Sequence, residues 1–174
     1  NVSSAAGTSQ VGVTRLARAQ KLGSTTFGST TSALGLSAGS FTLNGATVNV
    51  DANDTLTTLR DKINALDSGA AATKVSASIL QIDATHYRLV LTSDTTGAAG
   101  MTLANVSGGA PQALGLTDGS NVIQNSAVLV AGRDAEFTVD GVAMTRASNT
   151  ITDVITGVTL NLVAEEAGAV TNLT

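Results

Sequence analysis

Short runs in which apolar and polar residues alternate, separated by clusters of Gly, Ser, Asn and Asp, make up most of this chain. Residues 11–17 alternate in this way, and residues 22–35 are rich in Gly, Ser and Thr. Alternation puts successive side chains on opposite faces of a strand, whereas Gly and Ser clusters favour turns. The beginning of the chain is therefore predicted to form a strand followed by a linker.

Residues 41–50 have the pattern of a β-hairpin. Apolar residues lie on both sides of a central dipeptide, at Phe41, Leu43, Val48 and Val50. The dipeptide itself, Asn44-Gly45, favours a type I′ turn because both of its residues must adopt positive φ. We therefore expect two antiparallel strands joined by a two-residue turn.

The pattern changes to a helical period directly after this hairpin. Apolar residues are spaced three, four and three apart, at Leu56, Leu59, Ile63 and Leu66. This spacing lines one face of a helix of about three turns. Asp54 or Thr55 can cap the start of the helix, and Gly69 can help to end it.

Two further β-rich runs, at 74–83 and 86–94, are predicted to pair as a second hairpin. The Gly-rich tract 95–121 contains the single proline, Pro111, and is predicted to be mostly loop, with short elements near 101–103.

The strand pattern returns at 126–146. A short helix is predicted next, capped by Asn149 or Thr150 and ended by Gly157, and a last strand is predicted after it.

The chain contains an internal repeat. The pentapeptide that begins at Phe41, FTLNG, matches FTVDG at Phe137, and the apolar positions that follow correspond after a one-residue gap. Each copy is predicted to form a hairpin and a capped helix that covers the bare face of the hairpin. The residues expected to define this structural motif are Phe41, Asn44, Gly45, Leu56, Leu59 and Ile63 in the first copy and Phe137, Asp140, Gly141, Ile151, Val154 and Gly157 in the second.

A second echo, ALGLSAGS at 33–40 and ALGLTDGS at 113–120, brackets the first hairpin and helix. It suggests that residues 33–122 are a domain inserted between the segments 1–32 and 123–174, which together form a second, discontinuous domain. The expected fold class is α+β, mainly β, with two small β-rich domains that each contain hairpins and a short packed helix, one domain being inserted in the other.

Composition and charge narrow the functions to consider. The chain has 174 residues, no cysteine, one histidine and a formal net charge of −4. Its nine Lys and Arg are spread thinly, which argues against a nucleic-acid partner. No run approaches the length of a membrane span, and residues 1–10 lack the features of a secretory signal, so no membrane association is expected.

No catalytic or metal-binding constellation is predicted. His86 lies in a strand-like run and is interpreted as a surface residue, and Glu165 and Glu166 would point to opposite faces of a strand. A calcium loop at 51–62 fails because Leu56 stands where glycine is required and Lys62 where a bidentate glutamate is required. The prediction is therefore no enzyme, no cofactor and no metal.

An enzyme such as a glycosidase or peptidase remains an alternative that would require a deep pocket holding Asp134, Glu136 or Asp140 with shifted pKa values.

Four segments together resemble the bacterial flagellar filament cap family, also called flagellar hook-associated protein 2. They are VTRLARAQKLGSTTF from Val13, the segment that begins FTLNGATVNV, YRLVLTSDTTGAAG from Tyr87 and AEFTVDGVAMTRASNTITDVITGVTLNLV from Ala135. The segment 41–65 is also similar to a motif shared by flagellins and hook-associated proteins, whereas 134–163 is more specific to the cap family.

The resemblance implies a non-enzymatic protein that is exported through the flagellar apparatus without a cleaved signal peptide. Such a protein forms a homo-oligomeric ring or plate at the extracellular, distal tip of the filament and assists flagellin folding and insertion. Because neither end of this chain has long amphipathic helices, it corresponds to the central head of such a protein. Which residues form its interfaces stays open, with the helix face at 55–66 and the loops at 95–121 as candidates by exposure.

Two alternatives remain at this stage. The chain can be a fragment of flagellin or of a hook–filament junction protein, since these share the 41–65 motif. It can also be an adhesin module at the filament tip, with host mucin or glycans as partners and cell adhesion as its role.

Overall fold

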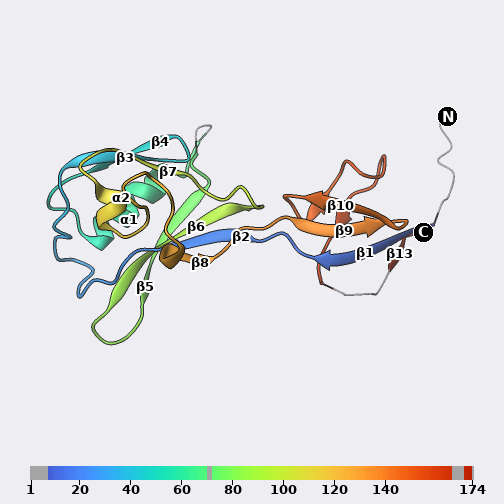
Figure 1. The fold of residues 1–174 in the computed structure, drawn as a ribbon, viewed down its shortest axis with the longest axis horizontal. Helices are drawn as coiled ribbons and strands as arrows, with labels where there is room; N and C mark the ends of the chain where they lie inside the picture. Colours follow the sequence, from blue (N-terminus) through green and yellow to red (C-terminus); the bar gives the residue numbers. More distant parts are fainter. Residues whose placement is uncertain (1–7, 70–71, 166–170, 174) are drawn as a thin grey trace. The chain divides into compact units, whose positions relative to one another are not determined.

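The computed structural model describes residues 8–69, 72–165 and 171–173, the last three by their backbone alone (Figure 1). Strands dominate, which confirms the mainly β fold class. The chain divides into two compact units: unit 1 contains the described parts of 1–18, 96–99 and 132–174, and unit 2 contains 19–95 and 100–131. None of the helices in the described part of the chain is long and apolar enough to cross a lipid bilayer.

Unit 1 is built from strands. Its four-stranded antiparallel sheet has the order β10-β9-β1-β13, formed by β1 (Ser9–Arg15), β9 (Ala135–Val139), β10 (Val142–Arg146) and β13 (Thr171–Leu173). A second, two-stranded sheet pairs β11 (Thr150–Ile151) with β12 (Leu160–Asn161). The buried core side chains of this unit are Val11, Ala17, Ala135, Phe137, Val139, Ile151, Leu160 and Leu162.

Unit 2 has two sheets and the longest helix. One sheet has the order β5-β6-β2-β8, with β2 (Ala19–Gly23), β5 (Val75–Gln81), β6 (Tyr87–Thr96) and β8 (Val128–Val130). The other has the order β4-β3-β7, with β3 (Gly39–Leu43), β4 (Ala46–Val50) and β7 (Leu103–Ser107). The helices are α1 (Leu56–Ala65), the short α2 (Ala110–Ala113) and a 3₁₀ turn, η1 (Asn125–Ala127).

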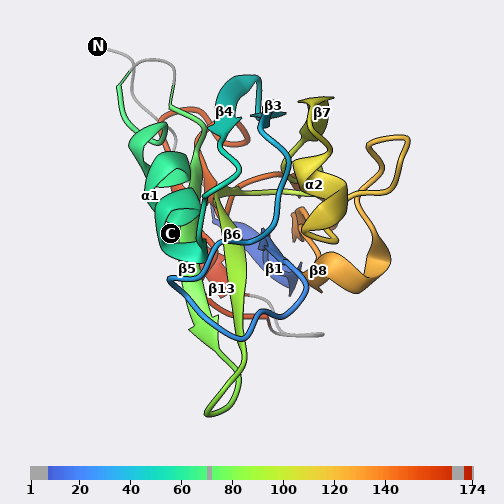
Figure 2. The ribbon, with the colours of Figure 1, turned by 90° about the vertical axis from the view of Figure 1, so that its left-hand side faces the viewer.

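Helix α1 packs on β5 and β4 (Figure 2). It brings Leu56, Leu59 and Ile63 into a single core with the inward side chains of both sheets. Val75 and Ala77 of β5 and Leu89 and Leu91 of β6 face the core, as predicted. Burial alternates along the first half of β5 but not along β6, where Val90 is also buried.

The boundaries of the units differ from the predicted domain boundaries. Residues 19–32 and 123–131, expected in the discontinuous domain, lie in unit 2 because β2 pairs with β8 and lies beside β6 in the same sheet. Both copies of the ALGL echo therefore belong to unit 2. Independent folding of the two units stays a prediction, for which an experiment is given in the Discussion.

The helix predicted to end at Gly157 is wrong. Residues 150–151 form β11, and the segment from Asp153 to Gly157 consists of bends and turns. Six of the seven residues from Thr150 to Thr156 are β-branched, which lowers helix propensity, whereas only three of the ten residues of α1 are. In this setting the pairing of β11 with β12 is formed instead of the helix.

The tract 95–121 also contains more regular structure than predicted. β7 runs from Leu103 to Ser107 and pairs with β3, and Pro111 lies in the first turn of α2, where its missing N–H costs no hydrogen bond.

Candidate functional site: two matched turns and a polar clamp

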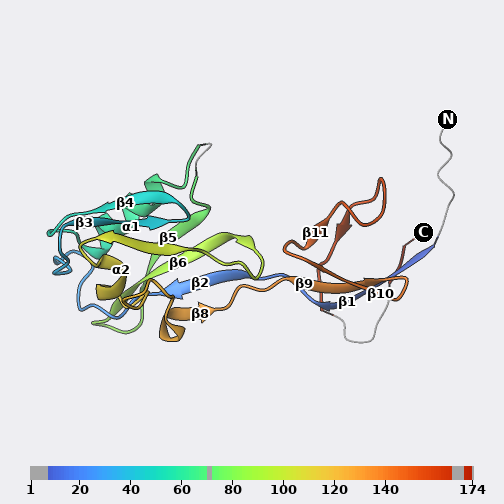
Figure 3. The same ribbon diagram turned by 45° about the horizontal axis from the view of Figure 1, so that its top comes forward.

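The two repeated hairpins have the same turn conformation. Asn44 and Gly45 have φ values of 47° and 85°, and Asp140 and Gly141 have φ values of 50° and 80°. Positive φ at both central residues fits the type I′ turn predicted for each copy. β3 and β4 lie side by side in unit 2, as β9 and β10 do in unit 1 (Figure 3).

The first turn residue of each hairpin also binds a third strand or the segment that leads into it. The Asn44 N–H donates to the carbonyl of Thr102 (3.0 Å), and the Thr102 N–H donates to Asn44 Oδ1 (2.8 Å). In the other copy the Asp140 N–H donates to the carbonyl of Gln10 (2.9 Å), and the Gln10 N–H donates to Asp140 Oδ1 (2.8 Å). The side-chain oxygen thus extends the pairing between the middle strand and the third strand by one residue, into the turn.

Phe41 and Phe137 occupy the same place in their copies. Each is 1% exposed, and each lies opposite an apolar residue of its hairpin partner, Val48 for Phe41 and Met144 for Phe137. The third strand pairs on the other side, so that both phenylalanines lie in the middle strand of a β4-β3-β7 or β10-β9-β1 arrangement. The repeat found in the sequence therefore extends to three strands.

Helix α1 begins where the sequence indicated. Thr55 is the N-cap, and its Oγ1 accepts the Thr58 N–H at 3.1 Å, while Thr58 Oγ1 accepts the Thr55 N–H at 2.9 Å. This reciprocal pair satisfies two backbone donors that the first turn of a helix leaves open. Leu56, Leu59 and Ile63 are fully buried, as the spacing predicted.

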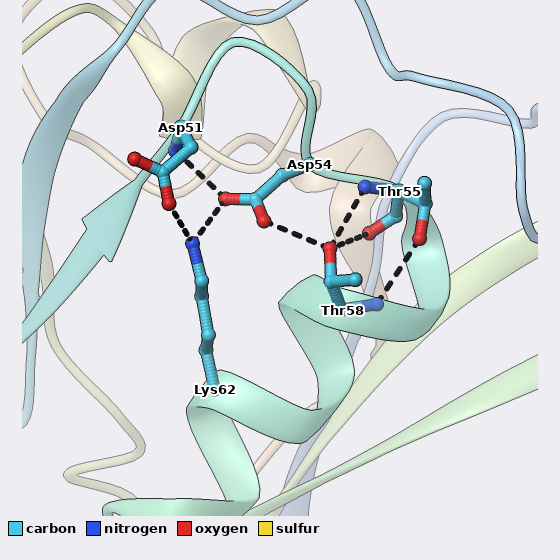
Figure 4. Close-up of polar contacts among 5 residues, drawn as sticks. All are labelled: Asp51, Asp54, Thr55, Thr58 and Lys62. Carbon is cyan, nitrogen blue, oxygen red and sulfur yellow. Dashed lines mark hydrogen bonds and ion pairs between the residues drawn. The ribbon is translucent and has the colours of Figure 1, made fainter.

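A group of polar side chains, here called the polar clamp, ties the helix to the end of β4. It consists of Asp51, Asp54, Thr58 and Lys62 (Figure 4). Lys62 Nζ lies 2.6 Å from Asp51 Oδ2 and 2.7 Å from Asp54 Oδ2. Asp54 also accepts the Asp51 N–H and the Thr58 hydroxyl, each at 2.8 Å.

The electrostatics of the polar clamp follow from these contacts. The Asp54 side chain is 5% exposed, and its burial opposes ionisation. Hydrogen bonds from Lys62, Asp51 and Thr58 outweigh that burial and lower the pKa of Asp54. Burial likewise disfavours the charged form of Lys62, but its contacts with Asp51 and Asp54 prevail and raise the pKa of Lys62. Asp54 and Lys62 therefore form an ion pair in which both groups are charged at neutral pH.

Lys62 thus has a structural role at the position that excluded a calcium loop. Its ammonium group lies between the two carboxylates. Among the described residues, no group of three or more His, Asp or Glu side chains is arranged to hold a metal ion.

Within the described residues, the second copy has no counterpart of α1 or of the clamp. Ile151 is 2% exposed in β11, Val154 packs on the core of unit 1 from a bend, and Gly157 has a φ of 79° in a turn. Asn149, predicted as a helix cap, instead binds the backbone of Ala17: Oδ1 accepts the Ala17 N–H at 2.7 Å and Nδ2 donates to the Ala17 carbonyl at 3.0 Å.

Sequence reasoning missed the bridging role of asparagine. Asn64 of α1 repeats the Asn149 geometry on β5, with Oδ1 accepting the Ala77 N–H at 2.7 Å and Nδ2 donating to the Ala77 carbonyl at 2.9 Å. A carboxamide can pair with both backbone groups of one residue. The sequence shows the asparagines but not their partners, which lie 13 positions from Asn64 and 132 positions from Asn149.

The carboxylates that an enzyme would need are engaged separately. Asp134 Oδ1 accepts the Ala98 N–H at 2.7 Å, Glu136 pairs with Arg15 at 2.8 Å, and Asp140 holds its turn. Glu165 pairs with Arg133, and Glu166, predicted to point to the opposite face of a strand, lies outside the described residues. His86 is a surface residue, as expected, and its Nδ1 lies 2.8 Å from Asp83.

Two family models match the chain. The flagellin hook IN motif matches residues 40–95, which contain the first hairpin and α1. The flagellar hook-associated protein 2 C-terminus model matches residues 132–174, which contain the second hairpin. The second match separates this chain from a flagellin or hook–filament junction fragment, the alternative left open by the first motif.

Longer relatives of the chain are named flagellar hook-associated protein 2, as the second family model is. Flagellar hook-associated protein 2 of Escherichia coli strain K12 is 36% identical over 157 residues, which are 85% of this chain and 32% of the relative. That of Salmonella typhimurium strain LT2 is 32% identical over 128 residues, which are 73% of this chain and 26% of the relative. The chain thus spans about a third of the length of these relatives or less.

Solved structures match almost the whole chain. The D2-D3 domains of the flagellar cap protein FliD from Escherichia coli are 33% identical with a TM-score of 0.81, over 99% of this chain and 90% of that one. The D2-D3 domains from Serratia marcescens are 28% identical with a TM-score of 0.75, over 99% of this chain and 95% of that one. The chain therefore belongs to the family of flagellar cap proteins, the flagellar hook-associated proteins 2.

Proposed function

We propose that this chain is the head part of a flagellar filament cap, which self-associates at the distal tip of the filament and assists the folding and insertion of flagellin. One observation carries the proposal: the match to the D2-D3 domains of a flagellar cap protein is nearly complete in both directions, over 99% of this chain and 90% of that one. Such agreement in sequence and fold supports a shared role, although function is carried by surfaces and not by the fold alone.

The role is structural, without catalysis. The polar groups of the candidate site bind other segments of the same chain. The turns bind third strands, the polar clamp ties α1 to the end of β4, and the asparagine amides join separate segments. A rigid body of this kind acts through its shape and through interfaces with other proteins, which agrees with assembly at a filament tip.

A chimera provides the test. The segment of E. coli flagellar hook-associated protein 2 that aligns with this chain is replaced by residues 1–174, and the chimera is expressed in E. coli cells that lack the native protein. We expect filaments to form and motility to return, because the replaced segment supplies an equivalent head. Electron microscopy of filament ends measures the presence of the cap.

A matched control keeps the result interpretable. The same chimera with Phe41→Ala, which opens a cavity in unit 2, is expected to restore fewer filaments. Secretion of unpolymerised flagellin by cells that produce and export the folded chimera would contradict the proposal. The predicted binding of host mucin or glycans and the predicted export without a cleaved signal peptide stay predictions.

A further inference from the structure

Exposed apolar side chains in unit 2 fall into two groups of opposite charge. Seven large apolar side chains of the described residues are 40–86% exposed, and five of them belong to this unit. Leu80, Ile82 and Leu129 accompany cationic residues, whereas Val106 and Val122 accompany an aspartate.

The first group lies on the face of the β5-β6-β2-β8 sheet that α1 does not cover. Alternation puts Leu80 on the opposite face of β5 from the buried Val75 and Ala77, and Leu80 pairs directly with Arg88 of β6. Leu129 of β8 lies where the register between β2 and β8 shifts, a β-bulge that redirects a side chain. These residues with Ile82 are called surface A: Leu80, Ile82, Arg88 and Leu129.

Gly23 of β2 allows this surface to form. A Cβ atom on Gly23 would lie 2.9 Å from Leu129 Cδ1 and 3.1 Å from Arg88 Nη1. The absence of that atom lets the guanidinium of Arg88 and the side chain of Leu129 lie over β2. Surface A therefore reaches across all four strands, from Leu80 to Leu129.

The charge of surface A lacks a partner within the described chain. Among the described residues, neither Arg88 nor Lys21, on the same face of β2 as Gly23, forms an ion pair with a carboxylate. Arg88 Nε is buried and makes no hydrogen bond with any described residue. Arg18 and Lys74 likewise form no ion pair among the described residues, but only Arg88 lies between the exposed apolar side chains of surface A, where its charge can meet an external carboxylate.

The second group comprises Val106 of β7 and the neighbouring loop that contains Asp118 and Val122. Asp118 Oδ1 accepts the N–H groups of Ser120 and Val122 at 2.8 and 2.9 Å, which fixes the carboxylate next to the 60% exposed Val122. Asn121 Oδ1 accepts the Asn105 N–H at 2.8 Å and so fastens this loop to the strand that carries Val106. Surface B is defined as Val106, Asp118 and Val122.

We propose that surface A of one copy binds surface B of a second copy, with Arg88 opposite Asp118 and the leucines against the valines. Opposite charge flanked by exposed apolar side chains on both sides supports this pairing. Contacts between two different surfaces of one molecule close into a ring when the rotation between subunits permits it. The inference rests on the proposed function, because it names the surfaces for the self-association assigned there.

Two charge reversals test the pairing in the 174-residue chain. Sedimentation velocity over a concentration series is expected to show association of the original chain. Arg88→Glu and Asp118→Lys should each weaken association at least about tenfold, because each opposes like charges. An equimolar mixture of the two variants should associate again. Glu at position 88 of one variant then faces Lys at position 118 of the other, and the unchanged Arg88 of the second variant faces the unchanged Asp118 of the first.

Three milder substitutions test whether the charge reversals weaken association by disrupting the local fold. Asp118→Asn keeps the acceptor for Ser120 and Val122 but removes the charge, and should weaken association without changing the denaturation midpoint. Val142→Ser, which alters an equally exposed valine of unit 1, should leave association unchanged. Leu129→Ser should weaken it.

The outcomes are distinct from those of the proposed function. A monomer at all concentrations, or single variants that associate as strongly as the original chain, would overturn the pairing of surfaces A and B. In that case restored filaments in the chimera would still support the head role, whereas loss of filaments with the pairing intact would overturn the head role alone.

Discussion

The β3–β4 and β9–β10 hairpins have similar pentapeptides, the same turn conformation and a third strand each, but the segments that follow them differ. In the first copy the chain leaves β4 through the polar clamp and forms α1, which fills the core of unit 2. In the second copy it leaves β10, pairs Ile151 with Leu160 and buries the same apolar positions through a strand and bends.

The difference shows which part of the repeat is locally encoded. A turn of two residues depends on their own φ preferences, so Asn-Gly and Asp-Gly give the same geometry in both units. A helix also needs a cap and residues of adequate propensity, and only the first copy has Thr55, Thr58 and few β-branched residues. Similar apolar spacing alone therefore did not produce similar structure.

The largest expected effect comes from emptying the core of one copy at a time. Phe41→Ala and Phe137→Ala should each destabilise their own unit by about 3–5 kcal/mol, because each side chain is buried and leaves a cavity. If the units fold independently, Phe41→Ala lowers the denaturation midpoint reported by Tyr87, the single tyrosine, which packs on the core of unit 2, and Phe137→Ala does not. Hydrogen exchange of β9 reports unit 1. Equal loss of protection in both units for either variant would show one cooperative domain.

The polar clamp gives the next effect. Asp54→Asn should cost about 1.5–3 kcal/mol at pH 7, since it weakens hydrogen bonds between charged groups. The pKa of Asp54 is lower in the folded protein than its ordinary value of 3.8, so this stabilisation is complete above that value and is lost as the pH falls through the folded pKa.

Urea denaturation of both proteins between pH 7 and pH 2 measures this difference. We expect the two free energies of unfolding to converge on acidification. A constant difference over the whole range would show that the ionised form of Asp54 has no part in stability. Asp61→Asn, on an exposed residue of α1 outside the clamp, serves as the control.

The shared turn should respond equally in both copies. Gly45→Val and Gly141→Val should each cost about 1–2 kcal/mol, because a β-branched residue is strained at positive φ and no neighbouring atom would clash with its Cβ. Thermal denaturation of the two variants measures the cost. An unchanged midpoint for either variant would contradict the strain assigned to its turn.

The smallest effect distinguishes the two continuations. Thr55→Ala should cost about 1 kcal/mol, because it removes the N-cap of α1. Thr150→Ala, at the start of the second continuation, should cost less than about 0.5 kcal/mol, since its exposed hydroxyl caps no helix of the described residues and loses only a solvent-exposed hydrogen bond to Asn161. Equal costs, measured by urea denaturation, would show that the helix cap does not distinguish the copies.

Much of the candidate site could be predicted from single residues. The Asn-Gly and Asp-Gly turns, the Thr55 cap and the buried face of Leu56, Leu59 and Ile63 are local features, and the structure has them where the sequence indicated. The partners of Asn44, Asn64 and Asn149 could not be predicted, because one carboxamide can bind any exposed pair of backbone groups.

Short-range sterics and periodicity in the sequence determined the turns, α1 and the residues of β5 and β6 that face the core. The packing of distant segments determined the third strand of each hairpin, the strand instead of a helix at Thr150 and the boundaries at residues 18 and 131. The physical reason is the range of the interactions: a φ preference or a cap acts within a few residues, whereas strand pairing and core burial depend on residues that meet only when the chain is folded.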